Sequence, residues 1–166
     1  GRKALARIRA LGMDESYIQF DGAHPTGTVE VTFDEKRNPD YYIVPGVAYD
    51  FIEITDGLTA IAPEAECLCY GTLIQRTRQS RETLRELLAG SPQSIKLLDV
   101  NLRKDCYTEE TVRLSLEEAD MLKLNADEAR RLAEMFRMRT ADAPGFCEEA
   151  IDRWSLTHCM ITFGGR

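Results

Sequence analysis

The sequence predicts an α/β protein: a mostly parallel β-sheet with helices packed against its faces, preceded by a small separate sheet. From about residue 55 onward in this 166-residue chain, short apolar runs alternate with amphipathic helical segments. This is the rhythm of β-α-β units joined by right-handed crossovers. The apolar runs are continuous, as strands covered by helices require. Before residue 55 the pattern changes to period-two alternation, which is typical of half-buried antiparallel strands.

The chain opens with an amphipathic helical pattern that ends near Gly12. Ala4, Ile8 and Leu11 fall on one face of this helix. We expect residues 1–16 to form a helix of the α/β core. The pattern is not that of a signal peptide, which would carry a continuous apolar stretch after its charged start.

Residues 17–54 form a β-rich block. Strand-like runs cover 17–20, 27–34 and 39–54. In the second run, polar Thr and Glu residues alternate with valines and a phenylalanine. The DEKRNPD segment that follows has turn composition, so strands 27–33 and 40–44 are expected to pair as a hairpin. The block therefore predicts a small sheet with one apolar and one polar face, serving as a cover over another part of the molecule.

Residues 55–166 carry the alternation of strands and helices. We predict strands over 67–73, 95–102, 120–125 and 158–165, and helices over 80–90, 108–119, 126–136 and 145–156. Thr108 is the expected N-cap of the second of these helices, and Gly90 ends the first. The last strand runs directly into glycines, and no strand precedes the first helix. We therefore expect this sequence to be the middle of a longer α/β protein.

Composition makes several kinds of partner improbable. The net charge is −7, the pI is near 5.0 and no basic stripe stands out, so nucleic acid and an acidic membrane surface are not expected partners. No apolar run approaches the roughly 20 residues of a membrane span. Five cysteines without CxxC spacing and only two histidines give no metal-ligand pattern. The cysteines are expected to be small buried residues in a reducing cytoplasm.

Polar residues lie at the end of the second predicted strand of the core. Asp99, Asn101 and Arg103 alternate there, which places their side chains on one face if the strand continues that far. Ligands bind at the carboxyl ends of strands in open α/β sheets, and the Arg guanidinium matches phosphate or carboxylate. The alternative is structural, with Asp99 and Arg103 forming a local ion pair beside Asn101 in a turn.

The following strand leads into an Asn-x-x-Glu pair, Asn125 and Glu128. Such a pair predicts a helix cap in which the two side chains satisfy free backbone N–H groups. In a second interpretation, Glu128 binds a cation or a water molecule that in turn contacts a phosphate, because helix N-termini attract anions. Walker A, GxGxxG, GxSxG and Ser/His/Asp patterns are absent from the sequence.

Five stretches resemble, in order and spacing, the ribokinase/PfkB family of carbohydrate kinases, and its fructokinase-like branch in particular. They are HPTGTVEVTFDEKRNPDYYIVPGVAYDFIEI, CLCYGTLIQR, LLDVNLRKDCY, ADMLKLNADEARRL and MITFGG. The resemblance implies a three-layer αβα sandwich with a small β-sheet lid over the sugar. It also implies transfer of the γ-phosphoryl group of ATP, with Mg²⁺ assisting, to a sugar hydroxymethyl group. The hairpin block would be part of that lid.

The resemblance further implies roles for single residues. Asn101 and Arg103 match an Asp-x-Asn-x-Arg pattern near the phosphoryl-transfer region. Asn125 and Glu128 match an Asn-x-x-Glu motif that helps to organise Mg²⁺ and phosphate, with Glu128 acting indirectly on the metal.

At the nucleotide, Thr162 and Gly164 match the Thr-x-Gly start of a nucleotide-binding loop. Glycine after a strand lets a ligand approach the backbone closely. Lys123 lies beside these motifs in the sequence and is a further candidate for phosphate contact.

Two family segments have no counterpart in the sequence: the sugar-binding segment with its Gly-Gly, and the Gly-Ala-Gly-Asp motif that supplies an anion hole and the catalytic Asp base. Without that base nothing deprotonates the sugar hydroxyl, so the chain alone is expected to be inactive. Alternatives are a kinase for a keto-deoxy sugar acid, ribose or a nucleoside, and a non-catalytic binding module with the same fold. The family's lids often pair between subunits, and the half-apolar block at 27–54 permits a homodimer.

Overall fold

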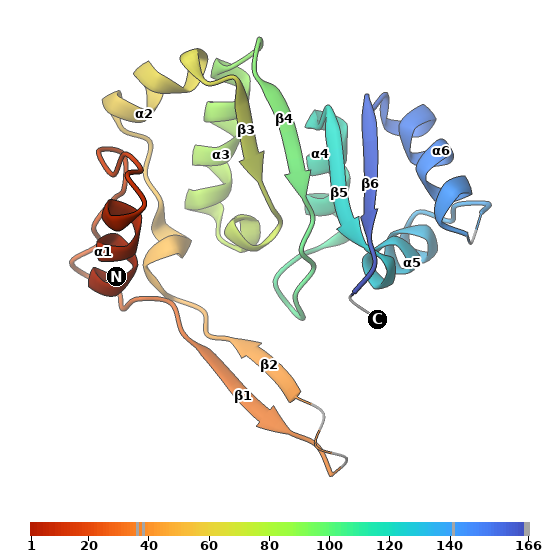
Figure 1. Cartoon of the computed structure of the whole chain (residues 1–166), viewed down its shortest axis with the longest axis horizontal. Helices are drawn as coiled ribbons and strands as arrows, with labels where there is room; N and C mark the ends of the chain where they lie inside the picture. The colour runs from red at the N-terminus through yellow and green to blue at the C-terminus, as the bar shows by residue number, and fades with distance from the viewer. Residues whose placement is uncertain (36, 38, 141, 165–166) are drawn as a thin grey trace.

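The computed structural model of the chain describes residues 1–35, 37, 39–140 and 142–164 (Figure 1). The described residues form two separate sheets. The strands are β1 (Val29–Phe33), β2 (Pro39–Ile43), β3 (Cys67–Tyr70), β4 (Ile95–Asp99), β5 (Met121–Asn125) and β6 (His158–Thr162). The helices are α1 (Arg2–Ala10), α2 (Asp56–Ile61), α3 (Arg78–Gly90), α4 (Glu109–Glu118), α5 (Ala126–Met135) and α6 (Ala143–Trp154). The short 3₁₀ helices in the described part of the chain are η1 (Ala48–Phe51), η2 (Ala62–Glu64) and η3 (Leu73–Arg76).

The larger sheet is parallel, with strand order β3-β4-β5-β6. The α/β class, the parallel sheet and the separate small sheet are confirmed, and so are the four strands and four helices predicted after residue 55. The strands are shorter than predicted, because backbone turns end them early; Asn101, for example, has a φ of 48° just after β4. Gly165 of the predicted last strand lies outside the described residues, as do Lys36 and Asn38 of the predicted turn.

The predicted hairpin is also confirmed, because β1 and β2 pair antiparallel with Val31 opposite Tyr41. It projects from the edge of the parallel sheet at which the strands end (Figure 1). Two further strand predictions are wrong. Residues 17–20 form no strand, and the run predicted over 39–54 leaves the sheet after Ile43 and continues into the 3₁₀ helix η1.

One hydrophobic core joins the parallel sheet to helices α3–α6. Leu98 of β4 and Leu122 and Leu124 of β5 point into this core and are almost completely buried. The helices contribute Leu84, Leu88, Val112, Leu116, Ala129, Leu132, Phe146, Ala150 and Trp154. Burial of this contiguous apolar surface is the main stabilising term of the fold.

The opposite face of the parallel sheet is open in the described part of the chain. Ile95 of β4 is 47% exposed and Met160 of β6 is 49% exposed, and Cys67 and Cys69 of β3 are exposed as well. The described helices thus supply one of the two helical layers of a three-layer sandwich. Parallel sheets are normally covered on both faces, so this open face is unusual.

In Figure 1, helix α1 lies on the far side of the segment that leads from the hairpin to α2, and none of its residues is buried. The assignment of residues 1–16 to the core and of 17–54 to a lid stays a prediction. Among the described residues, no helix combines the length and apolarity needed to cross a membrane.

Candidate functional site

The ends of the parallel strands bring several predicted site residues to one edge of the sheet. In the register of the sheet, Asp99 lies opposite Lys123, and Asn125 lies opposite Thr162. The Lys123 ammonium group donates to both carboxylate oxygens of Asp99, each at 2.9 Å. This half-exposed ion pair joins the ends of β4 and β5. The predicted local pair of Asp99 with Arg103 is therefore wrong, since Asp99 has Lys123 as its partner.

The loop after β4 carries the other two residues of the Asp-x-Asn-x-Arg pattern. Because Asn101 adopts a left-handed backbone conformation, the strand does not continue and the expected alternation on one face is not formed. Arg103 is exposed, and its guanidinium makes one long hydrogen bond of 3.5 Å to the carbonyl oxygen of Leu102. It forms no ion pair within the described residues. Its fork of N–H donors is consequently available to an anionic ligand.

Asn125 and Glu128 form the capping box that the sequence predicts. The side-chain oxygen of Asn125 accepts from the backbone N–H groups of Asp127 and Glu128, both at 2.9 Å. In return, Glu128 accepts from the backbone N–H of Asn125 at 2.9 Å. The amide nitrogen of the Asn125 side chain donates to no group in the described part of the chain and remains free for a ligand.

Glu128 has a second contact that the sequence did not reveal. Its other carboxylate oxygen accepts from the backbone N–H of Leu102 at 2.8 Å, and the side chain is only 7% exposed. Glu128 therefore holds the loop of Asn101 and Arg103 against the start of α5. Local pattern gives no signal for a partner 26 residues away.

Both oxygens of Glu128 are thus engaged by backbone N–H groups, which leaves little access for a metal ion. Among the described residues, no group of three His, Cys, Asp or Glu side chains is arranged to hold a metal. Mg²⁺ commonly keeps several waters and binds through one or two carboxylates and substrate phosphates. This arrangement does not fit direct ligation by Glu128, and its indirect role toward Mg²⁺ stays a prediction.

The predicted nucleotide-binding residues lie at the end of β6. The Thr162 hydroxyl donates to the carbonyl oxygen of Leu124 at 3.3 Å, across the edge of the sheet. Gly164 is exposed, and a Cβ atom added there would meet no atom within 4 Å. The structure gives Gly164 no internal packing reason to be glycine, and its predicted role toward a nucleotide stays untested.

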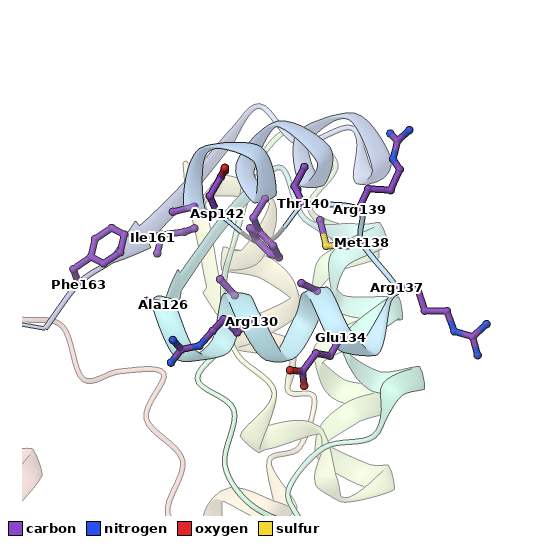
Figure 2. Close-up of a pocket in the computed structure, with 14 residues that line it drawn as sticks. Ala126, Arg130, Glu134, Arg137, Met138, Arg139, Thr140, Asp142, Ile161 and Phe163 are labelled. Atoms are coloured by element: carbon purple, nitrogen blue, oxygen red, sulfur yellow. The ribbon is translucent and has the colours of Figure 1, made fainter.

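A pocket of about 570 Å³ lies between α5, α6 and the end of β6 (Figure 2). Its lining combines apolar side chains with a charged rim. The apolar part consists of Ala126, Ala129, Ala133, Met138, Ala143, Phe146, Ile161 and Phe163, and the polar part of Arg130, Glu134, Arg137, Arg139, Thr140 and Asp142. None of the predicted site residues lines this pocket. The pocket is therefore separate from the strand-end site, by which we mean the predicted site residues at the ends of β4, β5 and β6.

Comparison with solved structures identifies the fold. A fructokinase from Xylella fastidiosa aligns with 99% of this chain at a TM-score of 0.79 and 16% sequence identity. A PfkB protein from Polaromonas sp. JS666 aligns with 99% at a TM-score of 0.78 and 17% identity. The chain has the fold of the PfkB sugar kinases. An uncharacterized sugar kinase from Pyrococcus horikoshii is similar over 81% of the chain, with a TM-score of 0.67 and 25% identity.

This chain spans about half the length of the PfkB structures that it matches: 52%, 56% and 46% of the three proteins above. The Xylella fructokinase has also been solved with bound ATP, and a Vibrio cholerae O395 fructokinase with fructose, ADP and a calcium ion. Comparison of the sequence with protein-family models and with curated proteins found no match.

Proposed function

We propose that the chain is part of an ATP-dependent sugar kinase of the fructokinase type, which transfers the γ-phosphoryl group of ATP to a sugar hydroxymethyl group. One observation carries the proposal. In a PfkB fold, the strand-end edge beneath the hairpin presents Arg103 exposed and without a carboxylate partner among the described residues. An unpaired guanidinium at the carboxyl ends of parallel strands suits a phosphate-bearing substrate.

The residues of this edge would act mainly by position and charge. Phosphoryl transfer depends on aligning the reactants and on stabilising charge that spreads over the phosphoryl oxygens. Arg103 would bind those oxygens, and the free side-chain amide of Asn125 would donate to a neighbouring phosphate. The charge of Lys123 is balanced by Asp99, so its ammonium group would contribute a further hydrogen-bond donor beside them. Mg²⁺, when bound with ATP, would neutralise charge on the phosphates.

The proposal includes the expectation that these 166 residues do not transfer phosphate by themselves. The catalytic Asp that the resemblance implies belongs to a Gly-Ala-Gly-Asp motif that does not occur in the sequence. A sugar hydroxyl needs a base within hydrogen-bonding reach to lose its proton. Measurable phosphorylation of fructose by ATP with the 166-residue chain alone would contradict this part of the proposal.

The function itself is tested with the gene product that contains these residues. Assayed with ATP and Mg²⁺, it is expected to phosphorylate fructose, and Arg103→Gln is expected to lower kcat by about 10²–10³-fold, as loss of one charge-stabilising donor does. Lys104→Gln, a change at the adjacent exposed position, is the matched control. A product that phosphorylates no sugar would refute the kinase proposal and favour a non-catalytic binding module.

A second substrate class is favoured by the same free guanidinium. Arg103 would pair equally well with the carboxylate of a keto-deoxy sugar acid, by the bidentate geometry that Arg forms with carboxylates. A substrate panel separates the cases, because a sugar-acid kinase would prefer the acid over fructose, ribose and nucleosides. Loss of that preference in Arg103→Gln would assign the residue to the substrate carboxylate.

We also propose that the hairpin pairs with a second copy of the chain. One face of β1–β2 carries Val29, Val31, Phe33 and Tyr41, which are between 45% and 67% exposed. A contiguous exposed apolar face of this kind marks an interaction surface. Sedimentation analysis is expected to show a dimer that Phe33→Asp dissociates. Thr32→Asp, on the polar face, should leave the dimer intact, and a monomeric parent protein would contradict the proposal.

A cytoplasmic location completes the proposal. It rests on the cysteines, all five of which are free thiols, as is usual in reducing compartments.

A further inference from the structure

The geometry points to Arg76 as the positioning residue of the β1–β2 hairpin. Arg76 fixes both strands of the hairpin at its base, which is where the chain enters β1 (residues 25–28) and where it leaves β2 (residues 43–50). Arg76 thereby sets where the hairpin lies relative to the β4–α4 loop that carries Asn101 and Arg103. The inference rests on the proposed function only in treating the hairpin as a lid over a sugar. The fixation itself is a property of the fold and can be tested without any activity.

Arg76, the last residue of η3, sends its guanidinium into the base of the hairpin. Its Nη1 and Nη2 atoms donate to the carbonyl oxygens of Ile43, at 3.1 Å, and Val44, at 2.8 Å, where β2 ends. Its Nε and Nη2 atoms donate to the two carboxylate oxygens of Asp50, at 2.6 and 2.7 Å. The remaining Nη1 donor lies 3.7 Å from the sulfur of Cys106. Every N–H donor of the guanidinium thus has a partner.

Asp50 is the centre of this cluster and is completely buried. One of its carboxylate oxygens also accepts from the backbone N–H groups of Gly46, at 2.9 Å, and Val47, at 3.2 Å. Burial alone would raise the pKa of the Asp50 carboxyl, but the hydrogen bonds from Arg76 and Val47 outweigh burial and hold that pKa below its usual value. The turn after β2 is therefore closed around an ionised carboxylate whose cationic partner among the described residues is Arg76.

The strand on the other side of the hairpin is held through Tyr49. The Arg76 guanidinium lies 5.3 Å from the centre of the Tyr49 ring. The same ring packs so closely on Gly27 that a Cβ atom at this position would clash with it. Just ahead of Gly27, the carbonyl oxygen of Pro25 accepts from the N–H of Ala48 at 2.9 Å. The chain entering β1 and the chain leaving β2 are consequently fastened to one side chain.

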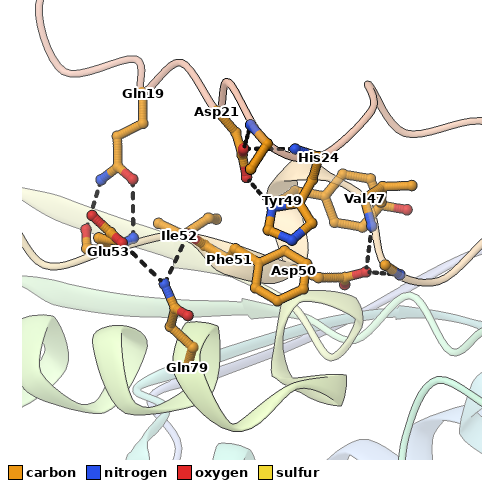
Figure 3. A network of polar contacts seen from close by, with 12 residues as sticks. Gln19, Asp21, His24, Val47, Tyr49, Asp50, Phe51, Ile52, Glu53 and Gln79 are labelled. Carbon is orange, nitrogen blue, oxygen red and sulfur yellow. Dashed lines mark hydrogen bonds and ion pairs between the residues drawn. The ribbon is translucent and has the colours of Figure 1, made fainter.

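The segment before the hairpin lies on the same base (Figure 3). The His24 ring stacks on Phe51 with 3.6 Å between ring centres, and its Nδ1 atom lies 2.7 Å from Asp21. Further along, the Gln19 amide makes two hydrogen bonds to the backbone of Glu53. The base is in turn hydrogen-bonded to α3, where Ser80 accepts from the N–H of Ile52 at 3.0 Å. The base of the hairpin is therefore rigidly connected to the core.

Contact beyond the base is weak by comparison. The β4–α4 loop reaches the hairpin through Lys104, whose ammonium lies 2.7 Å from the Asp40 carboxylate in β2. Both side chains are more than half exposed, and exposed pairs of this kind contribute little to stability. The Asp40–Lys104 pair reports where the hairpin lies, but it does not hold the hairpin there. That task falls to the buried cluster of Arg76.

A zero-length carbodiimide cross-link provides the test, because it joins only carboxylates and amines that are already in contact. In the 166-residue chain it is expected to link Lys104 to Asp40. It should also link Lys96 to Glu118, which are 3.3 Å apart between β4 and α4, and this core product serves as the internal standard. The ratio of the two products, measured by mass spectrometry, reports the position of the hairpin independently of overall folding.

In Arg76→Lys the charge is kept but the fork of donors is lost, because one ammonium cannot reach Asp50 and both carbonyl oxygens at once. The cross-link ratio is expected to fall, because loss of one charge-assisted hydrogen bond shifts the equilibrium between the held and the displaced hairpin about tenfold toward the displaced state. Arg78→Lys, two residues along and 84% exposed, should leave the ratio unchanged. The double variant Asp50→Asn with Arg76→Gln removes both charges, leaves no unpaired buried ion and should show the same loss.

An unchanged ratio in Arg76→Lys would overturn the inference, and so would an unchanged ratio in the double variant. If both cross-links decreased together, Arg76 would be a residue of general stability and not of hairpin position. If the single variant failed to fold, the double variant would decide. Because none of these measurements uses ATP or a sugar, failure of the kinase proposal would leave the outcome unaffected.

Discussion

Replacing Glu128 by glutamine tests whether its carboxylate joins the loop after β4 to the start of α5. The two oxygens accept from the backbone N–H groups of Leu102, at 2.8 Å, and Asn125, at 2.9 Å. A glutamine side chain has one acceptor oxygen, and its amide nitrogen would face the second N–H donor to donor. A buried N–H left without an acceptor costs about 1–3 kcal/mol. We therefore expect Glu128→Gln to lower the free energy of unfolding by about 2 kcal/mol.

Urea denaturation followed by the fluorescence of the single tryptophan measures this change. Trp154 is a suitable reporter because it is buried and packs edge-on against Phe136 with 5.3 Å between ring centres. Asp127→Asn is the matched control, because it lies in the same helical turn and is 83% exposed. Its effect is expected within about 0.5 kcal/mol. Equal destabilisation by the two substitutions would refute the two-sided role of Glu128.

Three further predictions concern the base of the hairpin, the core and a close backbone contact. The folded-state pKa of Asp50 lies below 3.8, so the stability that the ionised carboxylate contributes is complete above about pH 4 and is lost as the pH falls through that lower pKa. Urea denaturation should therefore show that the unfolding free energy decreases more steeply below about pH 4 in the parent chain than in Asp50→Asn. Leu98→Ala, at a fully buried position, should lower the unfolding free energy by about 2–5 kcal/mol, and Ile95→Ala, on the open face of the same strand, by well under half of that. Equal losses would contradict the placement of the core on the Leu98 face of the sheet. Gly71→Ala should cost about 1–3 kcal/mol, because its Cβ would lie 2.8 Å from the Asp99 carbonyl oxygen, whereas Gly90→Ala, which meets no atom within 4 Å, should not lower the melting temperature.

Most of the parallel sheet could be predicted from the sequence because its signals are local. Continuous apolar strands, amphipathic helices and caps such as Thr108 depend on neighbours a few residues away, and the structure confirms them. The capping box of Asn125 and Glu128 belongs to the same group. Patterns of this range survive in the folded chain because tertiary packing reinforces them.

The failures lie where long-range contacts decide. Tyr17, Ile18 and Phe20 have strand-like composition, yet they have no strand to pair with and remain exposed. Tyr49 and Asp50 look like strand residues, but the buried contact of Asp50 with Arg76, 26 residues away, curls that segment into a 3₁₀ helix. Local ion-pair reasoning likewise paired Asp99 with the wrong cation, because Lys123 becomes its neighbour only when β4 and β5 align.

The open face of the parallel sheet has a practical consequence for every experiment on this chain. The exposed side chains of Ile95 and Met160 and the β3 thiols form a largely apolar surface through which two chains can associate in solution. Such association would stabilise the folded state by mass action, so midpoints of unfolding would rise with protein concentration. Denaturation curves recorded over a dilution series, extrapolated to low concentration, would therefore separate the intrinsic stability of the fold from the stability contributed by contact with another chain.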